Sequence, residues 1–455
     1  MTLPLSLFIL FAAANQADPG SSRLTIAQAV EQALRNYPSI QVSQEQLNAA
    51  AAGIRLAQTA YLPRVDGLAQ INRATRNTFY GLLLPQGVIP NVDGVNANNV
   101  GTVWDSGAGV LVSWQPFDFG WRRANIGVST AARDQAQAAV NRTRYDVAVA
   151  TADAFLTEVA AEQTAQAARA SIESWQVLLK NIHALVDAQL RPGADESRVQ
   201  AELAQTQIQL AQAEQAIEVA RANLAQFVGL PTAQTNPASG KLVNQLPADR
   251  VETPLEAAAN PVAVEQNAAV AQAQAQLNSL ERTNFPQLSV QGSAAARGTG
   301  LETNGGRLGS LNGLGPTTQN YAAGLTVTFP FMDRYALRER ESMQNSQIRA
   351  EQARYQLIQR NLQGQFDTAL ARMAGARKVA ANTPVEISSA RAALSQATAR
   401  YQSGLAPIDD VAQAQRLLVQ AQIDDSLARL SVWRAQLELA TARGDLQPFL
   451  TEASQ

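Results

Sequence analysis

The chain has 455 residues, of which 46% are hydrophobic and 5% aromatic, and its formal net charge is −2. This balance argues against a nucleic-acid-binding protein, whose contact surface needs a clustered excess of Lys and Arg. The sequence has no cysteine, which excludes disulfides and thiolate metal sites. Scarce aromatic residues with abundant Ala and Gln favour long helices packed through small side chains over a thick globular core.

The chain begins with a mainly apolar run, LPLSLFILFAAA at 3–14, followed by small residues near Ala17. This is the pattern of the hydrophobic and cleavage regions of a secretory signal peptide. The usual basic start is missing, because no Lys or Arg precedes Arg23. We expect an atypical signal peptide over 1–18, with a buried N-terminal helix as the alternative.

The rest of the chain contains an internal duplication. The same spacing separates Pro38 from Pro63 and Pro261 from Pro286. Two further pairs of segments match in the same order: GVLVSWQPFDFGWRR at 109–123 with GLTVTFPFMDRYALR at 324–338, and 191–205 with 402–418. Three ordered pairs predict two halves built on one plan.

Each half starts with a helical run, over 24–60 and about 255–283, which a proline ends. Alternating apolar and polar stretches follow around Gly- and Asn-rich loops, at 74–103 and 296–320, that we expect to be extracellular. Alternation ending in aromatic residues is typical of a transmembrane strand of roughly 9–11 residues, although a sandwich strand looks similar. The predicted apolar faces are Val65, Gly67, Ala69 and Ile71; Ala108, Val110, Val112 and Trp114; Leu288, Val290 and Gly292; and Tyr321, Ala323, Leu325, Val327 and Phe329.

Long helical stretches come next, at roughly 121–190 and 335–402, and shorter helices return at 196–229 and 408–444. Seventy helical residues extend about 100 Å, which is longer than an ordinary globular helix. We expect Pro384 to bend or break the second stretch. The predicted domains are a signal peptide (1–18), a first repeat (19–229, with a hairpin at about 64–116 and a helical hairpin at 119–229), a linker (230–254), and a second repeat (255–455, with a hairpin at about 286–332, a helical hairpin at 335–444 and a C-terminal tail).

Neither the strands nor the helices complete their interactions within one copy. Open sheet edges are not tolerated in lipid, and eight strands are the usual minimum for a single-chain outer-membrane barrel. The returning helix carries an apolar stripe that needs neighbours, formed by Leu203, Ile208, Leu210, Ile217, Ala220 and Leu224. Both arguments predict a ring-shaped oligomer.

The duplicated order of these motifs resembles the TolC family of outer-membrane efflux proteins over about residues 24–450. The residues that carry the likeness are LTIAQAVEQALRNYPSIQ at 24–41, the strand-end blocks at 114–118 and 329–333, and the segments 191–205 and 402–418. The resemblance implies an α+β membrane protein with an internal two-fold repeat. It implies a trimer in which four strands per chain form a shared 12-stranded outer-membrane β-barrel and long antiparallel helices form a periplasmic α-barrel.

The resemblance also implies a location in the outer membrane of a Gram-negative bacterium, with the helical part in the periplasm. The implied function is a passive exit duct of a tripartite export system, for multidrug efflux or type I secretion. Its partners would be a periplasmic adaptor (membrane fusion) protein, an inner-membrane RND or ABC transporter, and outer-membrane lipid, with no nucleic acid and no cofactor. The aromatic residues expected near the membrane interfaces are Trp104, Trp114, Trp121, Tyr321 and Phe329.

The turn GLAPIDDV at 404–411 opens onto two adjacent carboxylates. In the resembling family this turn is the periplasmic end of the tunnel, where carboxylate rings raise local cation occupancy. A gate is therefore implied near 191–200 and 402–413, and its candidate residues are Asp410, Asp409, Tyr401, Gly404, Asp195, Glu196 and Arg198. Alternatively, Asp409 and Asp410 cap the following helix.

Arg198 is a candidate partner for either of these two aspartates. Ala406 and Gln413 stand where the family pattern leads us to expect a basic and an acidic residue, so the lock of the type member is not carried over intact. Asp118 and Asp333 are expected to cap or start the long helices. Other candidates are assigned to solvated or inter-chain positions (Arg122, Arg123 and Arg338) or to surface or packing (His183).

Two other classes of function compete with a duct. A soluble periplasmic coiled-coil adaptor or structural protein shares the helices, but it does not need alternating strands at equivalent places in both halves. An enzyme is not expected, because the sequence has one histidine and no HExxH, GxSxG or P-loop motif. We therefore assign no catalytic, cofactor-binding or metal residues.

Overall fold

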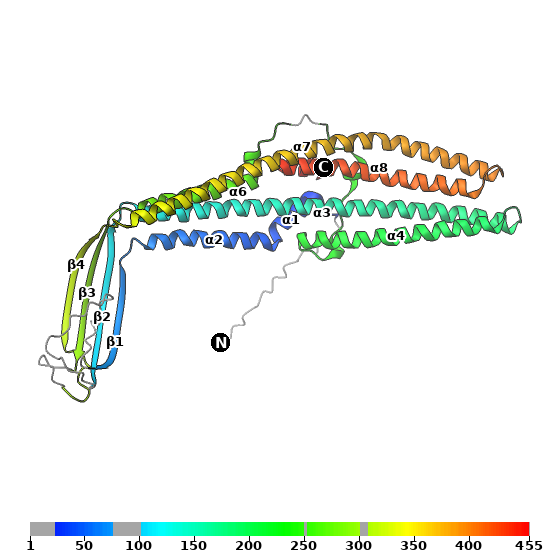
Figure 1. Cartoon of the computed structure of the whole chain (residues 1–455). Helices are drawn as coiled ribbons and strands as arrows, with labels where there is room; N and C mark the ends of the chain where they lie inside the picture. The colour runs from blue at the N-terminus through cyan, green and yellow to red at the C-terminus, as the bar shows by residue number, and fades with distance from the viewer. Residues whose placement is uncertain (1–22, 76–101, 250–252, 301–307, 455) are drawn as a thin grey trace, which may run out of the picture. The chain divides into compact units, whose positions relative to one another are not determined.

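The structure is a computed structural model that describes residues 23–75, 102–249, 253–300 and 308–454 (Figure 1). The expected signal peptide and much of the first predicted extracellular loop lie outside the described residues. The elements are α1 (Ile26–Asn36), α2 (Pro38–Thr59), β1 (Arg64–Thr75), β2 (Thr102–Phe117), α3 (Trp121–Asp187), α4 (Gly193–Val228), η1 (Thr232–Gln234), α5 (Gly240–Asn244), η2 (Ala257–Ala259), α6 (Pro261–Arg282), β3 (Gln287–Thr299), β4 (Thr318–Thr328), α7 (Asp333–Gln402), α8 (Ile408–Arg443) and α9 (Gln447–Ser454).

The chain forms two compact units, and α3 and α7 contribute to both. The strand unit consists of Ser43–Val140 and Val264–Leu357. The hairpin unit consists of Met1–Val42, Asn141–Ala263 and Ile358–Gln455. Each unit therefore draws on both halves of the sequence.

The predicted duplication is visible in the lengths of the helices. Helices α2 and α6 have 22 residues each, and α4 and α8 have 36 each. The first of these pairs starts at a proline, at Pro38 and Pro261, where the missing N–H is not needed. The preceding residues, Tyr37 and Asn260, are extended, because a following proline disfavours helical backbone. The helical run expected over 24–60 is therefore two helices, α1 and α2.

The strand unit contains one antiparallel sheet in the order β1-β2-β3-β4 (Figure 1). Val65 pairs with Val112, Val112 with Gly292, and Gly292 with Ala323. Because directly opposed residues lie on the same face of a sheet, the apolar faces predicted for the four strands form one face. This face is exposed in the single chain, and 92% of Tyr321 is accessible. In the described chain, β1 and β4 each have a single neighbouring strand.

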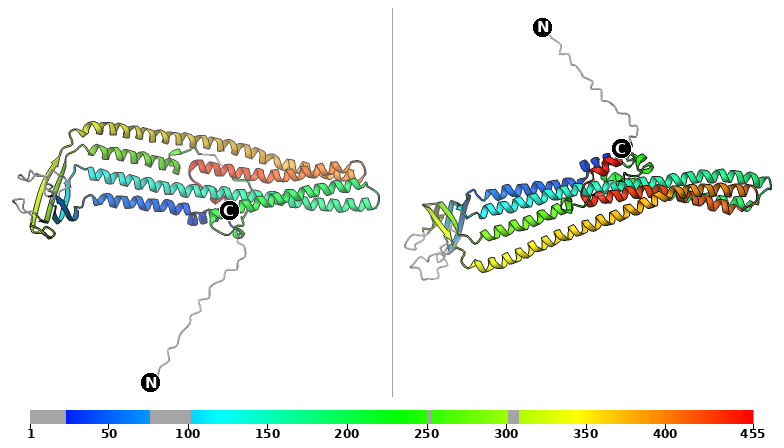
Figure 2. Two further views of the ribbon diagram at one scale, coloured as in Figure 1. Left: turned by 60° about the horizontal axis from the view of Figure 1, so that its bottom comes forward. Right: turned by 90° about the horizontal axis from the view of Figure 1, so that it is seen from above.

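Among the described helices, none combines the length and the apolar character that a membrane span requires. In the hairpin unit, α4 runs antiparallel to the distal part of α3, and α8 runs antiparallel to that of α7 (Figures 1 and 2). The stripe expected on α4 is buried at Ile217, Ala220 and Leu224. Ile208 is an exception, because 52% of it is exposed.

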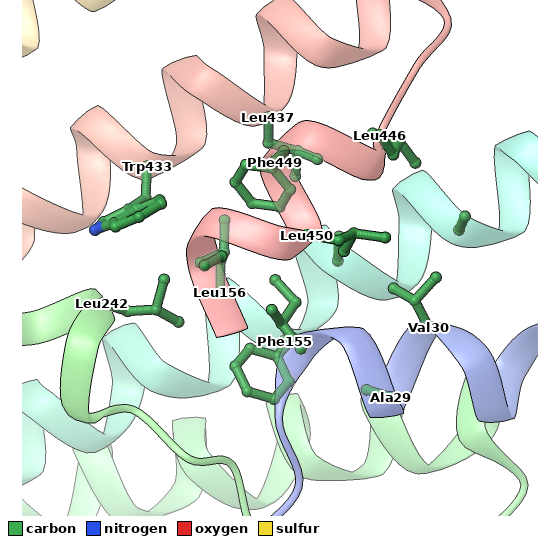
Figure 3. Close-up of a cluster of buried hydrophobic side chains, with 14 of the residues drawn as sticks. Ala29, Val30, Phe155, Leu156, Leu242, Trp433, Leu437, Leu446, Phe449 and Leu450 are labelled. Carbon is green, nitrogen blue, oxygen red and sulfur yellow. The ribbon is translucent and has the colours of Figure 1, made fainter. Parts of the chain in front are cut away.

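The largest core of the hairpin unit joins segments that are far apart in the sequence (Figure 3). Short helices α1, α5 and α9 pack here against α3, α4 and α8. Its buried side chains include Val30, Phe155, Leu156, Leu224, Leu242, Trp433, Leu437 and Phe449. Polar contacts add to it: Lys241 Nζ donates to the carbonyl oxygen of Glu452 at 2.8 Å, and the backbone N–H of Ala248 donates to its Oε1 at 2.6 Å. The segments predicted as a linker and a tail thus contribute to this core.

Pro384 does not break α7, which continues from Asp333 to Gln402. A proline removes the hydrogen bond to the carbonyl four residues earlier, here that of Ala380. Ala380 is buried in a cluster shared with α8, and the neighbouring Thr383 hydroxyl donates to Asp425 Oδ1 on α8 at 2.5 Å. Packing along α8 therefore keeps the helix continuous where its own hydrogen bonding is interrupted.

Candidate gate at the helical turns

The two turns that reverse the helical hairpins have the same backbone design. Gln189 and Gly404 have left-handed backbone angles, with φ of 59° and 77°. The next residues, Leu190 and Leu405, donate their N–H groups back to carbonyls of the preceding helix, at 2.9 and 2.8 Å. This is the Schellman arrangement, in which glycine is preferred at the left-handed position because it has no Cβ.

A proline starts the returning helix after each turn. Pro192 and Pro407 are the N-cap residues of α4 and α8, and neither helix has a side-chain cap hydrogen bond. Counting from these prolines, Asp195 and Asp410 occupy the same position in the two helices. The first-half aspartate is thus the structural counterpart of the candidate gate residue Asp410.

Tyr401, at the end of α7, joins the two hairpins. Only 2% of Tyr401 is exposed, and its hydroxyl donates to Oδ2 of Asp195 at 2.8 Å. The Arg191 guanidinium lies over the Tyr401 ring, 4.4 Å from its centroid, and donates to the Tyr401 carbonyl. Burial and the hydrogen bond to the Asp195 carboxylate raise the pKa of Tyr401 to about 12. The phenol therefore stays a hydrogen-bond donor at neutral pH.

An exposed ion pair joins the same hairpins. Arg198 Nε lies 3.1 Å from Oδ1 of Asp409, which decides between the two partners considered for this arginine. Glu202 lies 3.8 Å from both Arg198 and Arg416. Glu202 and Arg416 are not among the predicted gate residues, and they lie two and three residues beyond the predicted gate segments 191–200 and 402–413.

The capping role expected for Asp409 and Asp410 is wrong. Both lie inside the first turn of α8, whose N-cap is Pro407 and which has no side-chain cap bond. Their carboxylates still face the positive end of the helix dipole. Asp410 is exposed and forms no ion pair with any described residue. Within the described residues, Asp409 pairs with Arg198 and Asp195 accepts a hydrogen bond from Tyr401, whereas the Asp410 carboxylate has neither kind of partner.

Glu196 pairs with the single histidine. His183 Nδ1 lies 3.1 Å from Oε1 of Glu196, and its Nε2 lies 3.4 Å from Oδ2 of Asp187. With 60% of its side chain exposed, His183 is a surface residue of the hairpin. The described residues contain no group of three or more side chains suited to a metal ion.

An apolar cluster beneath the turns holds the hairpins together. Its fully buried members come from all four helices of the two hairpins: Trp175, Ile182, Val199, Tyr401, Ile408, Val411 and Ala412. Their spacing is that of ordinary helix packing. Only the tertiary structure distinguishes this cluster from the other apolar stripes.

Of the predicted interface aromatics, Trp104, Trp114 and Tyr321 lie within strands, Phe329 follows a strand and Trp121 starts a helix. Arg73 of β1 lies over the ring of Trp104 in β2, 5.2 Å from its centroid, and Trp114 Nε1 of β2 donates to the Tyr61 carbonyl at 3.0 Å. Phe329 follows β4 and stacks on Phe331. Tyr321 is exposed on the apolar face, and Trp121 is the half-buried first residue of α3.

The junction between β2 and α3 is a buried polar cluster. Asp118 accepts the N–H groups of Gly120 and Arg122 at 3.1 and 2.9 Å, so it caps α3 as expected. Asp333 is the first residue of α7. Arg122 was expected to be solvated or to pair between chains, and this is wrong. It is 3% exposed, and its side chain donates to Asp118 Oδ2 at 2.6 Å and to the Ala60 carbonyl at 3.0 Å.

A family model for the outer membrane efflux protein family matches residues 29–230 and 255–445. The match covers most of the chain and falls once in each half. The chain therefore belongs to the outer membrane efflux protein family. No curated protein matches the sequence significantly.

Solved outer-membrane channels share this fold. The channel OprN is 19% identical, covers 92% of this chain and 89% of its own, and gives a TM-score of 0.73. CusC is 14% identical, with 92% of each chain covered and a TM-score of 0.74. VceC from Vibrio cholerae is 17% identical, covers 92% of this chain and 96% of its own, and gives a TM-score of 0.70.

The predicted family, fold and function are confirmed by these matches. The protein is an efflux duct of the outer membrane, and its helical part is periplasmic. The matched proteins are channels rather than enzymes, and the alternative of a soluble coiled-coil protein is not favoured.

Proposed function

We propose that three copies of this chain form the exit duct of a tripartite export system. The observation that carries this proposal is the sheet of the strand unit, which has one apolar exposed face and two open edges. Lipid tolerates the apolar face but not the unpaired N–H and C=O groups of the edges. Joining β4 of one copy to β1 of the next satisfies both edges, and three copies close a twelve-stranded barrel.

The oligomer is tested with the detergent-solubilised full-length protein. Native mass spectrometry is expected to give three times the mass of the mature chain. One cysteine placed in β1 and one in β4 are expected to cross-link between copies. Because the sequence has no cysteine of its own, no other disulfide can form. A folded monomer, or cross-links within one chain only, would contradict the proposal.

The gate of this duct lies at the turns near 191–200 and 402–413. Tyr401 with Asp195, and Arg198 with Asp409, tie the hairpins of one chain to each other. The duplication suggests the contact between neighbouring copies. Tyr401 and Val186 each lie three residues before the left-handed residue of their turn, so Asp410 of one copy would meet Val186 of the next, as Asp195 meets Tyr401 within one chain. Valine offers no donor, so Asp410 remains unpaired. Three such carboxylates around one axis repel each other and concentrate cations.

The partners follow from the same role. A passive duct needs an energised transporter, so we assign an inner-membrane pump of the RND or ABC type and a periplasmic adaptor. The adaptor would contact the turns, where opening requires the hairpins to move apart. Cross-linking from positions 190–200 and 402–412 in cells is expected to capture a periplasmic adaptor, and capture confined to the outer membrane would argue against this assignment.

Conductance in planar bilayers tests the gate. Replacing Asp410 with Ala is expected to raise single-channel conductance or to weaken the preference for cations, because the carboxylate ring is lost. Asp424→Ala is the matched control, since Asp424 is a charged residue of the same helix outside the turn. Unchanged conductance and selectivity in the Asp410 variant would dismiss the gate role and leave the duct itself untouched.

A further inference from the structure

Glu158, in the middle of α3, is a fully buried carboxylate. Its exposed fraction is 0%, and glutamate is almost never buried to this extent without a partner. One oxygen, Oε1, lies 3.2 Å from Nε of Arg221 on α4. The other oxygen, Oε2, has no hydrogen-bond partner in the described part of the chain. This side chain is thus only half satisfied as an anion.

The positive charge of Arg221 is shared between Glu158 and a second carboxylate. Its Nη1 also lies 2.9 Å from Oε1 of Glu218 on α4, and Glu162 is one turn further along α3. Burial raises the pKa of Glu158 to about 7; the Arg221 bond and charge lower it, and the charges of Glu162 and Glu218 raise it further. Other charged groups of the neighbouring elements are Arg23 before α1, Arg169 and Glu214 on α3 and α4, and Arg434 on α8.

A route for water lies beside the buried carboxylate. Glu162, Glu218 and Arg221 line a polar cavity of about 850 Å³ that opens to solvent between α3, α4 and the segment 236–239. All three of these side chains act electrostatically on Glu158. Hydration of Glu158 therefore requires only a local separation of α3 and α4, and no change of fold.

We propose that Glu158 and Arg221 form a proton-controlled latch between α3 and α4. With a proton on Glu158, the neutral side chain stays buried and the two helices remain in close contact. Without the proton, Oε2 carries charge and needs water, so the contact loosens as the pH rises. The latch lies in the hairpin whose turn carries Asp195 and Arg198, and it therefore controls how firmly that hairpin is held. It rests on the geometry of one chain and not on the proposed gate.

Hydrogen–deuterium exchange on the assembled full-length protein tests the latch. Exchange is compared at about pH 5.5 and about pH 8.5, either side of the titration, after correction for the intrinsic effect of pH on exchange. In the wild-type protein, amides over 155–162 and 217–225 are expected to exchange severalfold faster at the higher pH. In Glu158→Gln, which keeps the shape without the charge, they are expected to stay slow at both.

Two further variants keep the test decisive. Glu214→Gln removes an exposed carboxylate of α4, paired with Arg169 at 3.0 Å, and should respond to pH as the wild type does. Arg221→Gln removes the group that lowers the pKa of Glu158, so its transition should move to higher pH. This shift remains measurable even if Glu158→Gln does not assemble. Equal wild-type exchange at both pH values, or a pH response retained in Glu158→Gln, overturns the latch.

Discussion

Two buried carboxylate–guanidinium pairs, one in each unit, have opposite electrostatics. Asp118 accepts hydrogen bonds at both oxygens, from two backbone N–H groups and from Arg122. Glu158 accepts one, from Arg221, and its second oxygen is bare. Burial pushes the pKa of Asp118 upward, but the bonds from Arg122 and Gly120 outweigh it and hold the pKa below its usual value. For Glu158 burial prevails and the pKa rises to about 7.

The difference shows that the supply of donors, and not burial alone, decides whether a buried charge is stable. Asp118 lies where a strand ends and α3 begins, and the first N–H groups of a helix have no partners within the helix. Glu158 lies in mid-helix, where the backbone N–H groups already bond to the preceding turn. Asp118 therefore receives its hydrogen bonds from residues close to it in the sequence. Glu158 depends on a donor from a neighbouring helix.

The largest effect is expected for Arg122→Leu, which copies Leu337, the equivalent residue of the second half. Asp118 would keep a buried charge without its guanidinium, which destabilises by about 3–5 kcal/mol. Thermal unfolding of the assembled protein measures this. Arg123→Leu, at the neighbouring exposed position, should be near neutral. Adding Asp118→Asn to Arg122→Leu should recover part of the loss. Equal losses in the single and double variants would show that the unpaired Asp118 charge is not their cause.

Glu158→Gln, in contrast, is expected to stabilise the protein at neutral and alkaline pH. The folded pKa is raised above the unfolded value, so the folded state holds more protons and loses stability as the pH rises from about 4.5 to about 7. Above that window the variant should be more stable than the wild type by roughly 1–3 kcal/mol. Unfolding midpoints from about pH 5 to about pH 8.5 test this, and a variant that is less stable at alkaline pH would contradict it.

Asp118→Asn is expected to change the stability of the protein at acid pH. A folded pKa held below the unfolded value gives stability that is present above about pH 3.8 and lost as the pH falls through the folded pKa. The variant should lack this loss at acid pH while keeping the decline between about pH 4.5 and about pH 7 that is due to Glu158. Acid unfolding monitored by circular dichroism would show the change in slope. If the variant lost stability at acid pH as steeply as the wild type, other carboxylates would be the cause of that loss.

A smaller effect is expected at the turns for Tyr401→Phe. The substitution removes one buried hydrogen bond to Asp195, worth about 1 kcal/mol, and keeps the packing of the ring. Single-channel recordings should show more frequent opening. Tyr355→Phe, on the same helix outside the turn, is the control. Gating identical to that of the wild type would show that the hydrogen bond from Tyr401 to Asp195 does not hold the gate closed.

The smallest effect is expected for Arg198→Ala. Its ion pair with Asp409 is largely exposed, and such pairs contribute less than about 1 kcal/mol and are screened by salt. Any increase in opening should therefore appear at low ionic strength and vanish at high ionic strength. A salt-independent effect would indicate a role other than this pair.

Much of the fold was predictable because its determinants are local. Prolines at equivalent places revealed the duplication, and two-residue alternation identified the strand faces that the register of the sheet then confirmed. The turns were predictable as places, since glycine and proline interrupt two helical patterns. Within them, only the position of Arg198 on another helix shows that Asp409 is paired and Asp410 is not.

The duplicated plan, the lengths of the helices and the apolar faces were determined by the sequence itself, because each depends on residues that are neighbours in the chain. The tertiary structure decided which charges are buried and which segments form the central core. Arg122 meets the Ala60 carbonyl, Glu158 meets Arg221, and α9 closes on α5. These contacts join residues far apart in the chain, and such distances are set only when helices and strands pack.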